Sequence, residues 1–148
     1  MPSTHSSLHC HVIFSTKDRR PFLETEIRDR VFEFLGGCLR HHDAQPLGIG
    51  GVADHVHLLF GFKPTHSISD LIRDVKKPSS EWIQSDLGIR KFSWQIGYGA
   101  FSVSKSAIPK VRRYITEQET HHQRHTFENE YVEFLERHGV EYNEKYLW

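Results

Sequence analysis

The spacing of hydrophobic and polar positions along the chain predicts a mixture of strands and helices. β-forming residues dominate residues 9–16, 47–53 and 55–62, which predicts three strands, the last two joined by a turn near Asp54. Apolar residues recur at helical spacing over residues 24–42, which predicts a helix between the first and second strands.

A second helix is expected to begin near Ile68. Ser67 and Asp70 stand in the spacing of a helix cap, and apolar residues follow at helical intervals. Pro78 falls inside this pattern. Because proline lacks a backbone N–H and its ring meets the preceding turn, we expect the helix to kink or split there.

The remaining pattern completes an alternating order of elements. Residues 92–103 predict a fourth strand, and residues 106–124 and 127–137 predict two further helices, the last of them ended by Gly139. The order β-α-β-β-α-β matches the ferredoxin-like arrangement, an antiparallel sheet with helices on one face. We therefore expect an α+β fold, one domain over residues 1–148 with a C-terminal helical tail. This fold hosts many functions, so it does not identify one.

Composition narrows the class of protein. The chain has 148 residues, of which 37% are hydrophobic, and no apolar run approaches the ~20 residues that span a membrane. Cys10 and Cys38 are too few for a disulfide framework and indicate free thiols in a reducing compartment. The 19 basic and 19 acidic residues cancel, so any nucleic-acid site must be a local basic patch. The 12 histidines are the unusual feature, because histidine is the commonest metal ligand.

One pair of histidines lies on a predicted strand. Alternation places His55 and His57 on the same face, about 7 Å apart, where two imidazoles can converge on one divalent ion. A second His-x-His, formed by His9 and His11, shows how common the bare pattern is in a histidine-rich chain. The position of His55 and His57 just after a turn, on a hydrophobic strand, favours them as ligands.

A predicted helix carries the other candidate chemistry. Tyr114 and Gln118 are four residues apart and share a helical face. A tyrosine can attack a phosphodiester when a metal polarises the phosphate, and an amide oxygen of Gln118 can serve as a third ligand. The ordinary alternatives are a tyrosine that caps the core and a solvated glutamine. We expect His121 and His122 near a helix end rather than among the ligands.

Five segments together resemble a known family. They are H-V-I-F-S-T-K-D-R-R-P-F-L, A-D-H-V-H-L-L, V-K-K-P-S-S-E-W-I, W-Q-I-G-Y-G-A-F-S-V-S and Y-I-T-E-Q, in that order along the chain. The chain resembles the single-tyrosine HUH transposases of the insertion-sequence 200 type, which include the REP-associated tyrosine transposases. HUH stands for histidine, hydrophobic residue, histidine, here His55, Val56 and His57.

The resemblance implies a complete activity. It implies a DNA transposase, a single-stranded DNA endonuclease and strand transferase, in which Tyr114 forms a 5'-phosphotyrosine and frees a 3'-hydroxyl. It implies that His55, His57 and Gln118 hold Mg²⁺ or Mn²⁺. The expected partners are single-stranded DNA hairpin ends and a second copy of the chain in a homodimer. The expected location is the prokaryotic cytoplasm, in association with the nucleoid and not with a membrane.

DNA contacts must come from a subset of the basic residues, since the chain is neutral overall. The candidates are Lys17, Arg19, Arg20, Arg73, Lys76, Lys77, Lys110 and Arg113, together with Lys105 and Arg112. A solvated surface charge is the ordinary alternative for each. Phe92, Trp94 and Tyr98 are candidates for stacking on unpaired bases, although we expect at least two of them to pack in the core.

Three other functions remain open from the residues alone. The first is a single-stranded nucleic-acid-binding module without catalysis. The second is a metal-dependent nuclease that uses water as its nucleophile and does not need Tyr114. The third is a domesticated relative that keeps the site but no longer moves an element.

Overall fold

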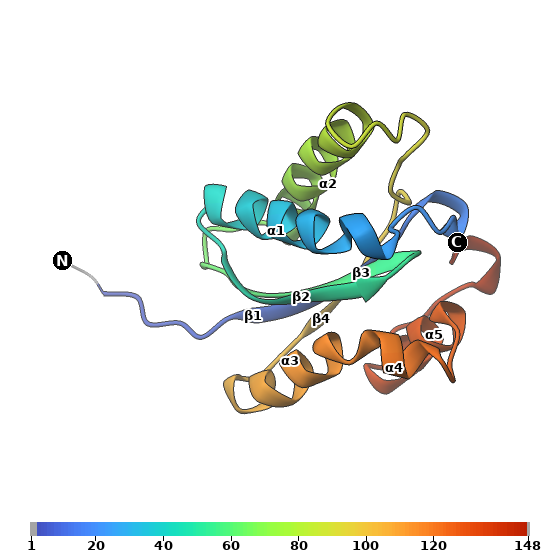
Figure 1. The fold of residues 1–148 in the computed structure, drawn as a ribbon. Coiled ribbons are helices and arrows are strands. Elements are labelled where there is room, and N and C mark those ends of the chain that lie inside the picture. The colour runs from blue at the N-terminus through green and yellow to red at the C-terminus, as the bar shows by residue number, and fades with distance from the viewer. Residues whose placement is uncertain (1–2, 148) are drawn as a thin grey trace.

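The computed structural model describes residues 3–147 and is built on a four-stranded antiparallel sheet (Figure 1). The strands stand in the order β2-β3-β1-β4, and every neighbouring pair is antiparallel. Their bounds are β1 His9–Ser15, β2 Gln45–Val52, β3 His55–Gly61 and β4 Gly99–Ser102. This strand order and the sequence of connections confirm the expected ferredoxin-like fold.

Helices cover both faces of the sheet (Figure 1). On one face lie α1 (Thr25–His41) and α2 (Ile68–Ser85), as expected for the ferredoxin-like unit. On the other lie the C-terminal helices α3 (Ile108–Thr116), α4 (Gln118–His122) and α5 (Phe127–Arg137). The sheet is therefore buried on two sides, and the six residues from His55 to Phe60 are all buried.

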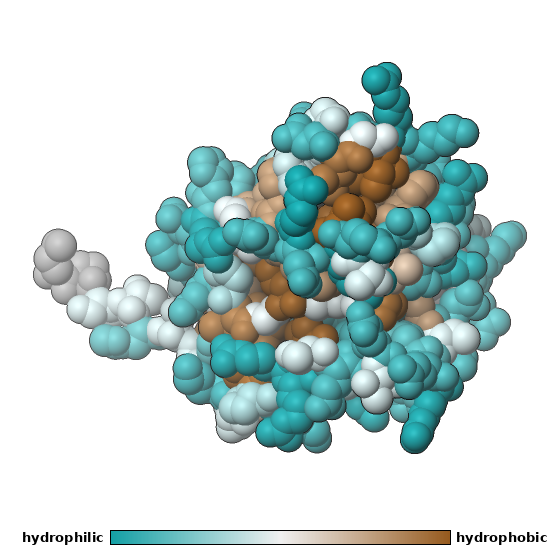
Figure 2. Space-filling view, viewed as in Figure 1, coloured by the Kyte–Doolittle hydropathy of each residue, from teal (hydrophilic) through white to brown (hydrophobic). Residues whose placement is uncertain are grey.

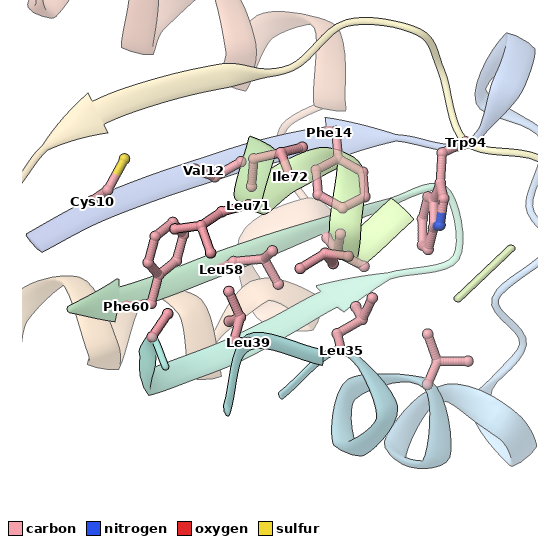
Figure 3. Close-up of a cluster of buried hydrophobic side chains, with 14 of the residues drawn as sticks. Cys10, Val12, Phe14, Leu35, Leu39, Leu58, Phe60, Leu71, Ile72 and Trp94 are labelled. Atoms are coloured by element: carbon pink, nitrogen blue, oxygen red, sulfur yellow. The ribbon is translucent and has the colours of Figure 1, made fainter. Parts of the chain in front are cut away.

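The main hydrophobic core lies between the sheet and the pair α1 and α2 (Figure 3). Alternate residues of each central strand point into it, Val12 and Phe14 from β1 and Leu58 and Phe60 from β3. Each such fully buried side chain contributes roughly 1.5–3 kcal/mol of hydrophobic free energy. The intervening residues of the same strands face α3, α4 and α5 instead.

The surface of this side of the molecule is mostly hydrophilic (Figure 2). Hydrophobic residues reach the surface where α1 and α2 lie side by side. There the rings of Phe34 and Trp82 stack with their centroids 4.4 Å apart. Among the described residues, no helix has both the length and the apolar content to cross a membrane.

Pro78 does not split the second helix. α2 runs without interruption from Ile68 to Ser85, and buried residues stand on both sides of the proline, among them Val75 and Ser79. Packing of this stripe on the sheet outweighs the single backbone hydrogen bond that proline cannot donate.

The predicted strand over residues 92–103 is much shorter than expected. Only Gly99–Ser102 pairs as β4, and Trp94 makes one isolated bridge, to Thr16. The ammonium of Lys76 donates hydrogen bonds to the carbonyls of Gln95, Ile96 and Gly97 at 2.9, 3.2 and 2.7 Å. These carbonyls are satisfied by a side chain, so the segment forms a loop in which Ile96 is fully exposed.

The predicted helix over residues 106–124 is two helices. α3 ends at Thr116 and α4 begins at Gln118, with Glu117 between them at φ −94° and ψ 22°, outside helical geometry. The break lies three residues after Tyr114. Beyond it, α4 packs on β2.

Candidate functional site

Two histidines from the centre of the sheet form the base of the site. His55 and His57 point to the face covered by α3, α4 and α5, and both side chains are fully buried. Their neighbours Val56 and Leu58 point into the opposite core. The strict alternation of β3 therefore places both imidazoles on one side, as the sequence predicts.

Each of these imidazoles is oriented through its Nδ1 atom. Nδ1 of His55 lies 2.8 Å from Oδ1 of Asp54, and Nδ1 of His57 lies 2.8 Å from Nε2 of His11. His11 belongs to the other His-x-His, on β1, and is itself buried. The Nε2 atoms are left facing the interior of the site. Partners of this kind fix the ring orientation of metal-ligating histidines in proteins.

A glycine lets the tyrosine helix lie directly on the sheet. A Cβ atom at Gly50 of β2 would stand 2.6 Å from the carbonyl oxygen of Ile115 in α3. The absence of a side chain at Gly50 therefore permits this close approach. It brings the ring of Tyr114 to 5.8 Å from that of His57, centroid to centroid.

The break after α3 brings Gln118 onto the histidines. Its Oε1 lies 3.0 Å from Nε2 of His55, and the side chain is buried. Its Nε2 lies 3.5 Å from the carbonyl of Tyr114. The structure thus brings together all four residues that the sequence singles out, His55, His57, Tyr114 and Gln118, within one chain.

Two further residues enter the site that the sequence did not single out. Glu130 of α5 is 1% exposed, and its Oε1 lies 3.0 Å from Nε2 of His57 and 3.1 Å from Nε2 of His55. Nε2 of His122 lies 3.2 Å from the same oxygen. His122 ends α4, as expected, and its imidazole also reaches the site because α4 packs on the sheet beside His55.

The hydroxyl of Tyr114 is held at the edge of this cluster. It donates a hydrogen bond to Oε2 of Glu130, and Nε2 of His121 lies 3.2 Å from it. Nε2 of Gln118 donates to the same carboxylate oxygen at 3.2 Å. One carboxylate therefore links the tyrosine to the three imidazoles.

Burial and the local charges shift the pKa values of these groups in different directions. Burial lowers the pKa of His57 to about 4, while hydrogen bonds to Asp54 and Glu130 outweigh burial at His55 and raise its pKa to about 9. Burial raises the pKa of Glu130, but hydrogen bonds to the histidines outweigh it and hold the pKa far below its ordinary value. Burial and the nearby carboxylate raise the pKa of Tyr114. The carboxylate is therefore charged and the tyrosine protonated at neutral pH.

The donor set suits a divalent metal ion. One ligand atom from each of His55, His57, His122 and Glu130 lies within 4.8 Å of the other three. Ligands at right angles around an ion, each about 2.1 Å from it, stand about 3 Å apart. The three imidazole-to-carboxylate distances agree with that spacing, so these residues could hold a metal.

The basic candidates do not gather at one place. Arg73, Lys76 and Lys77 line a groove between α2 and the loop of residues 93–98, whereas Lys110 and Arg113 lie on α3 across the sheet. Lys17 and Arg20 are exposed beyond β1. Four side chains have protein partners: Arg19 pairs with Glu128, Arg73 pairs with Asp70 and Asp74, Lys76 holds the loop carbonyls, and Arg112 donates to the carbonyl of Leu47. Phe92 and Trp94 are buried in the core, and Tyr98 packs against it.

Fold and site together define a class. A ferredoxin-like sheet with a buried His-x-His on a central strand, beneath a helix that carries a tyrosine, is the arrangement expected for single-tyrosine HUH transposases. The chain matches the family Transposase IS200 like over residues 4–118 and belongs to that family. It is therefore a transposase, with a role in DNA transposition and recombination through DNA cutting and strand transfer.

Individual relatives agree with this assignment. The transposase for insertion sequence element IS200 of Salmonella typhimurium is 29% identical over 122 residues, which cover 77% of this chain and 80% of the relative. The ISDra2 transposase TnpA of Deinococcus radiodurans is 24% identical over 117 residues, 75% of this chain and 84% of the relative.

Solved structures share the fold. A crystal structure from Deinococcus radiodurans R1, assigned as a transposase, has a TM-score of 0.66 at 25% identity and covers 80% of this chain and 95% of its own. A REP-associated tyrosine transposase bound to a REP hairpin has a TM-score of 0.60 at 14% identity, with 82% of this chain and 74% of that chain covered.

Proposed function

We propose that this transposase cuts and rejoins single-stranded DNA through a 5'-phosphotyrosine at Tyr114. In this proposal His55, His57 and Gln118 hold a divalent ion, Mg²⁺ or Mn²⁺, beside the scissile phosphate. One observation carries the proposal. The hydroxyl of Tyr114 and the Nε2 atoms of both histidines contact the same buried carboxylate, although they come from separate elements.

The chemistry follows from the placement of the hydroxyl. In cleavage, the phenolic oxygen of Tyr114 forms a bond to phosphorus, the bond from phosphorus to the 3' oxygen breaks, and the 3' oxygen leaves as a hydroxyl. Glu130 accepts a hydrogen bond from the phenolic hydroxyl and orients it, and Nε2 of His121 lies 3.2 Å from the phenolic oxygen, where it is placed to accept the proton. That proton balances the one that the leaving 3' oxygen takes up. When bound, the metal supplies Lewis-acid polarisation of the phosphate. Rejoining is the reverse, with another 3'-hydroxyl as the nucleophile.

The proposed substrate is the hairpin end of a mobile element. The REP-associated relative is bound to a REP hairpin, and we extend that class of partner to this chain. Exposed basic residues on either side of the sheet, such as Lys77, Lys110 and Arg113, are the proposed phosphate contacts. We also propose a homodimer, on the strength of the family resemblance. The ring of Tyr114 lies 5.8 Å from that of His57 of the same chain, centroid to centroid, which supports a site completed within one subunit.

The test is a cleavage assay on end-labelled single-stranded DNA that carries an element end, with Mg²⁺, Mn²⁺ or EDTA. We expect a metal-dependent protein–DNA adduct on a denaturing gel, absent from Tyr114→Phe, while DNA binding by that variant is unchanged. Tyr142→Phe removes a hydroxyl that donates to Glu136, away from the site, and serves as the matched control.

Two of the three rival functions, the nuclease that uses water and the binding module, give different results in the same assay. Metal-dependent cleavage without an adduct, unaffected by Tyr114→Phe, would establish a water nucleophile. DNA binding that is insensitive to EDTA, without cleavage of any element end, would establish a binding module. Light scattering of the purified protein tests the homodimer separately.

A further inference from the structure

The C-terminal segment closes the candidate metal site. The family match ends at residue 118, whereas His122 and Glu130 lie beyond it, on α4 and α5. Both place a ligand atom among those of His55 and His57. The segment that the sequence presents as a helical tail therefore contributes directly to the centre of the site.

Hydrogen bonds alone do not account for the packing around Glu130. Three imidazole Nε2 atoms stand 3.0–3.2 Å from its Oε1, and a carboxylate oxygen offers about two lone pairs. Oε1 of Gln118 lies a further 3.0 Å from Nε2 of both His55 and His122. Several acceptor atoms thus converge on one small volume, which a shared cation would satisfy.

The hydrogen-bond partners of the imidazole Nδ1 atoms also favour a metal. Nδ1 of His122 lies 2.7 Å from the backbone carbonyl of His125, and a carbonyl can only accept, so this Nδ1 carries a proton. Nδ1 of His55 faces the carboxylate of Asp54 in the same manner. With the proton on Nδ1, the lone pair of Nε2 in a neutral imidazole is available to a metal.

We propose that His122 and Glu130 are direct metal ligands, so that three imidazoles, a carboxylate and the amide oxygen of Gln118 hold the ion within this one chain. The inference rests on the proposed function for its metal and extends it in two respects, the ligand set and the ion. Nitrogen-rich sites favour first-row transition ions, whereas Mg²⁺ prefers oxygen ligands. The site is therefore built for Mn²⁺, Co²⁺ or Zn²⁺ in preference to Mg²⁺.

Metal binding to the full chain without DNA tests the proposal. Titration calorimetry with Mn²⁺ is expected to give one site, bound more tightly than Mg²⁺. Loss of an outer-sphere partner costs about 10–100-fold in affinity, so loss of a direct ligand should cost about 100-fold or more. We expect that loss for His122→Ala and for Glu130→Gln. Circular dichroism of the metal-free variants checks that they are folded.

Two control variants replace a histidine and a glutamate near the proposed ligands, one between α4 and α5 and one on α5. His125→Ala removes an exposed imidazole but keeps the carbonyl that accepts from His122. Glu133→Gln changes a carboxylate on α5 that is 57% exposed. Both should bind Mn²⁺ as the parent chain does. Pulsed electron paramagnetic resonance should count three coordinated imidazole nitrogens in the parent chain and two in His122→Ala.

The possible failures can be told apart. Parent-like Mn²⁺ affinity in His122→Ala and Glu130→Gln, with binding lost in His57→Ala, would overturn the proposed ligands and leave the transposase chemistry standing. Two coordinated nitrogens in both the parent chain and His122→Ala would overturn the role of His122. Mn²⁺ binding that depends on His57, His122 and Glu130, in a protein that forms no DNA adduct, would support the ligand set and contradict the phosphotyrosine function.

Discussion

The contact between α3 and β2 at Gly50 gives a quantitative test of how the tyrosine is placed. In Gly50→Ala the new Cβ would lie 2.6 Å from the carbonyl oxygen of Ile115 and 2.9 Å from its Cγ2. Ordinary contact begins near 3.4 Å, so α3 must move away from the sheet by about 0.8 Å. Overpacking of this kind costs about 1–3 kcal/mol of stability.

The same displacement moves Tyr114 away from the metal ligands. A misplacement of about 1 Å in a catalytic group reduces the rate by about 100-fold. Urea denaturation should therefore show a less stable protein, and the rate of adduct formation should fall by one to two powers of ten, on the order of that estimate. The rate is measured with saturating metal and DNA, so that weaker binding does not contribute to it, and urea denaturation is measured on the protein without metal or DNA, because a bound ligand would add its own binding free energy.

Gly37→Ala in α1 is the matched control. No heavy atom lies within 4 Å of a Cβ at Gly37, and alanine favours a helix by up to about 1 kcal/mol over glycine. This variant should be more stable and fully active. If Gly50→Ala proved as stable as Gly37→Ala and formed the adduct at the parent rate, the close packing of α3 on β2 would be refuted. Lower stability together with the parent rate would confirm the close packing and show that it does not control the rate of adduct formation.

Two further predictions concern the partners of the site histidines, and a third concerns the loop of residues 93–98. His57→Ala should weaken Mn²⁺ binding more than His11→Ala does, because the loss of His11 only leaves the imidazole of His57 free to rotate. Equal effects in calorimetry would mean that His11 is also a ligand. Asp54→Asn should lower Mn²⁺ affinity by about 10–100-fold, because the partner of His55 loses its charge, and an unchanged affinity would show that the strand alone orients the ring. Lys76→Met should lower the free energy of unfolding by about 1.5–3 kcal/mol, since three loop carbonyls lose a charged donor. Unchanged urea denaturation would show that water replaces the ammonium.

Much of the fold could be predicted from local patterns. Alternation and helical spacing located β1, β2, β3 and α1 to within about two residues, because each has one face in a large core. The failures have tertiary causes. Residues 92–98 have strand-forming composition, but the ammonium of Lys76 takes the carbonyls that a neighbouring strand would need. The break at Glu117 has no proline or glycine to mark it, because the packing of α3 and α4 on β2 imposes it.

Four residues of the candidate site could be predicted for a similar reason. His55 and His57 are two positions apart on one strand, and Tyr114 and Gln118 are four apart near one helix end, so each pair has a local signature. The contact between the pairs is different. It depends on Gly50, which sets the distance between helix and sheet and which has no pattern of its own in the sequence.

Glu130 shows how a nonlocal site residue could still be suspected from sequence. It lies 73 positions from His57 in the chain, yet it stands on the buried side of α5 with Phe127 and Tyr131. A carboxylate on an apolar helical stripe must find a partner, because an unpaired buried charge costs several kcal/mol. Histidines that have no other assigned role are the available partners, because an imidazole can donate a hydrogen bond to a carboxylate or carry the opposite charge. An acidic residue on the apolar side of a tail helix, in a protein with 12 histidines, is therefore evidence that the tail belongs to the site.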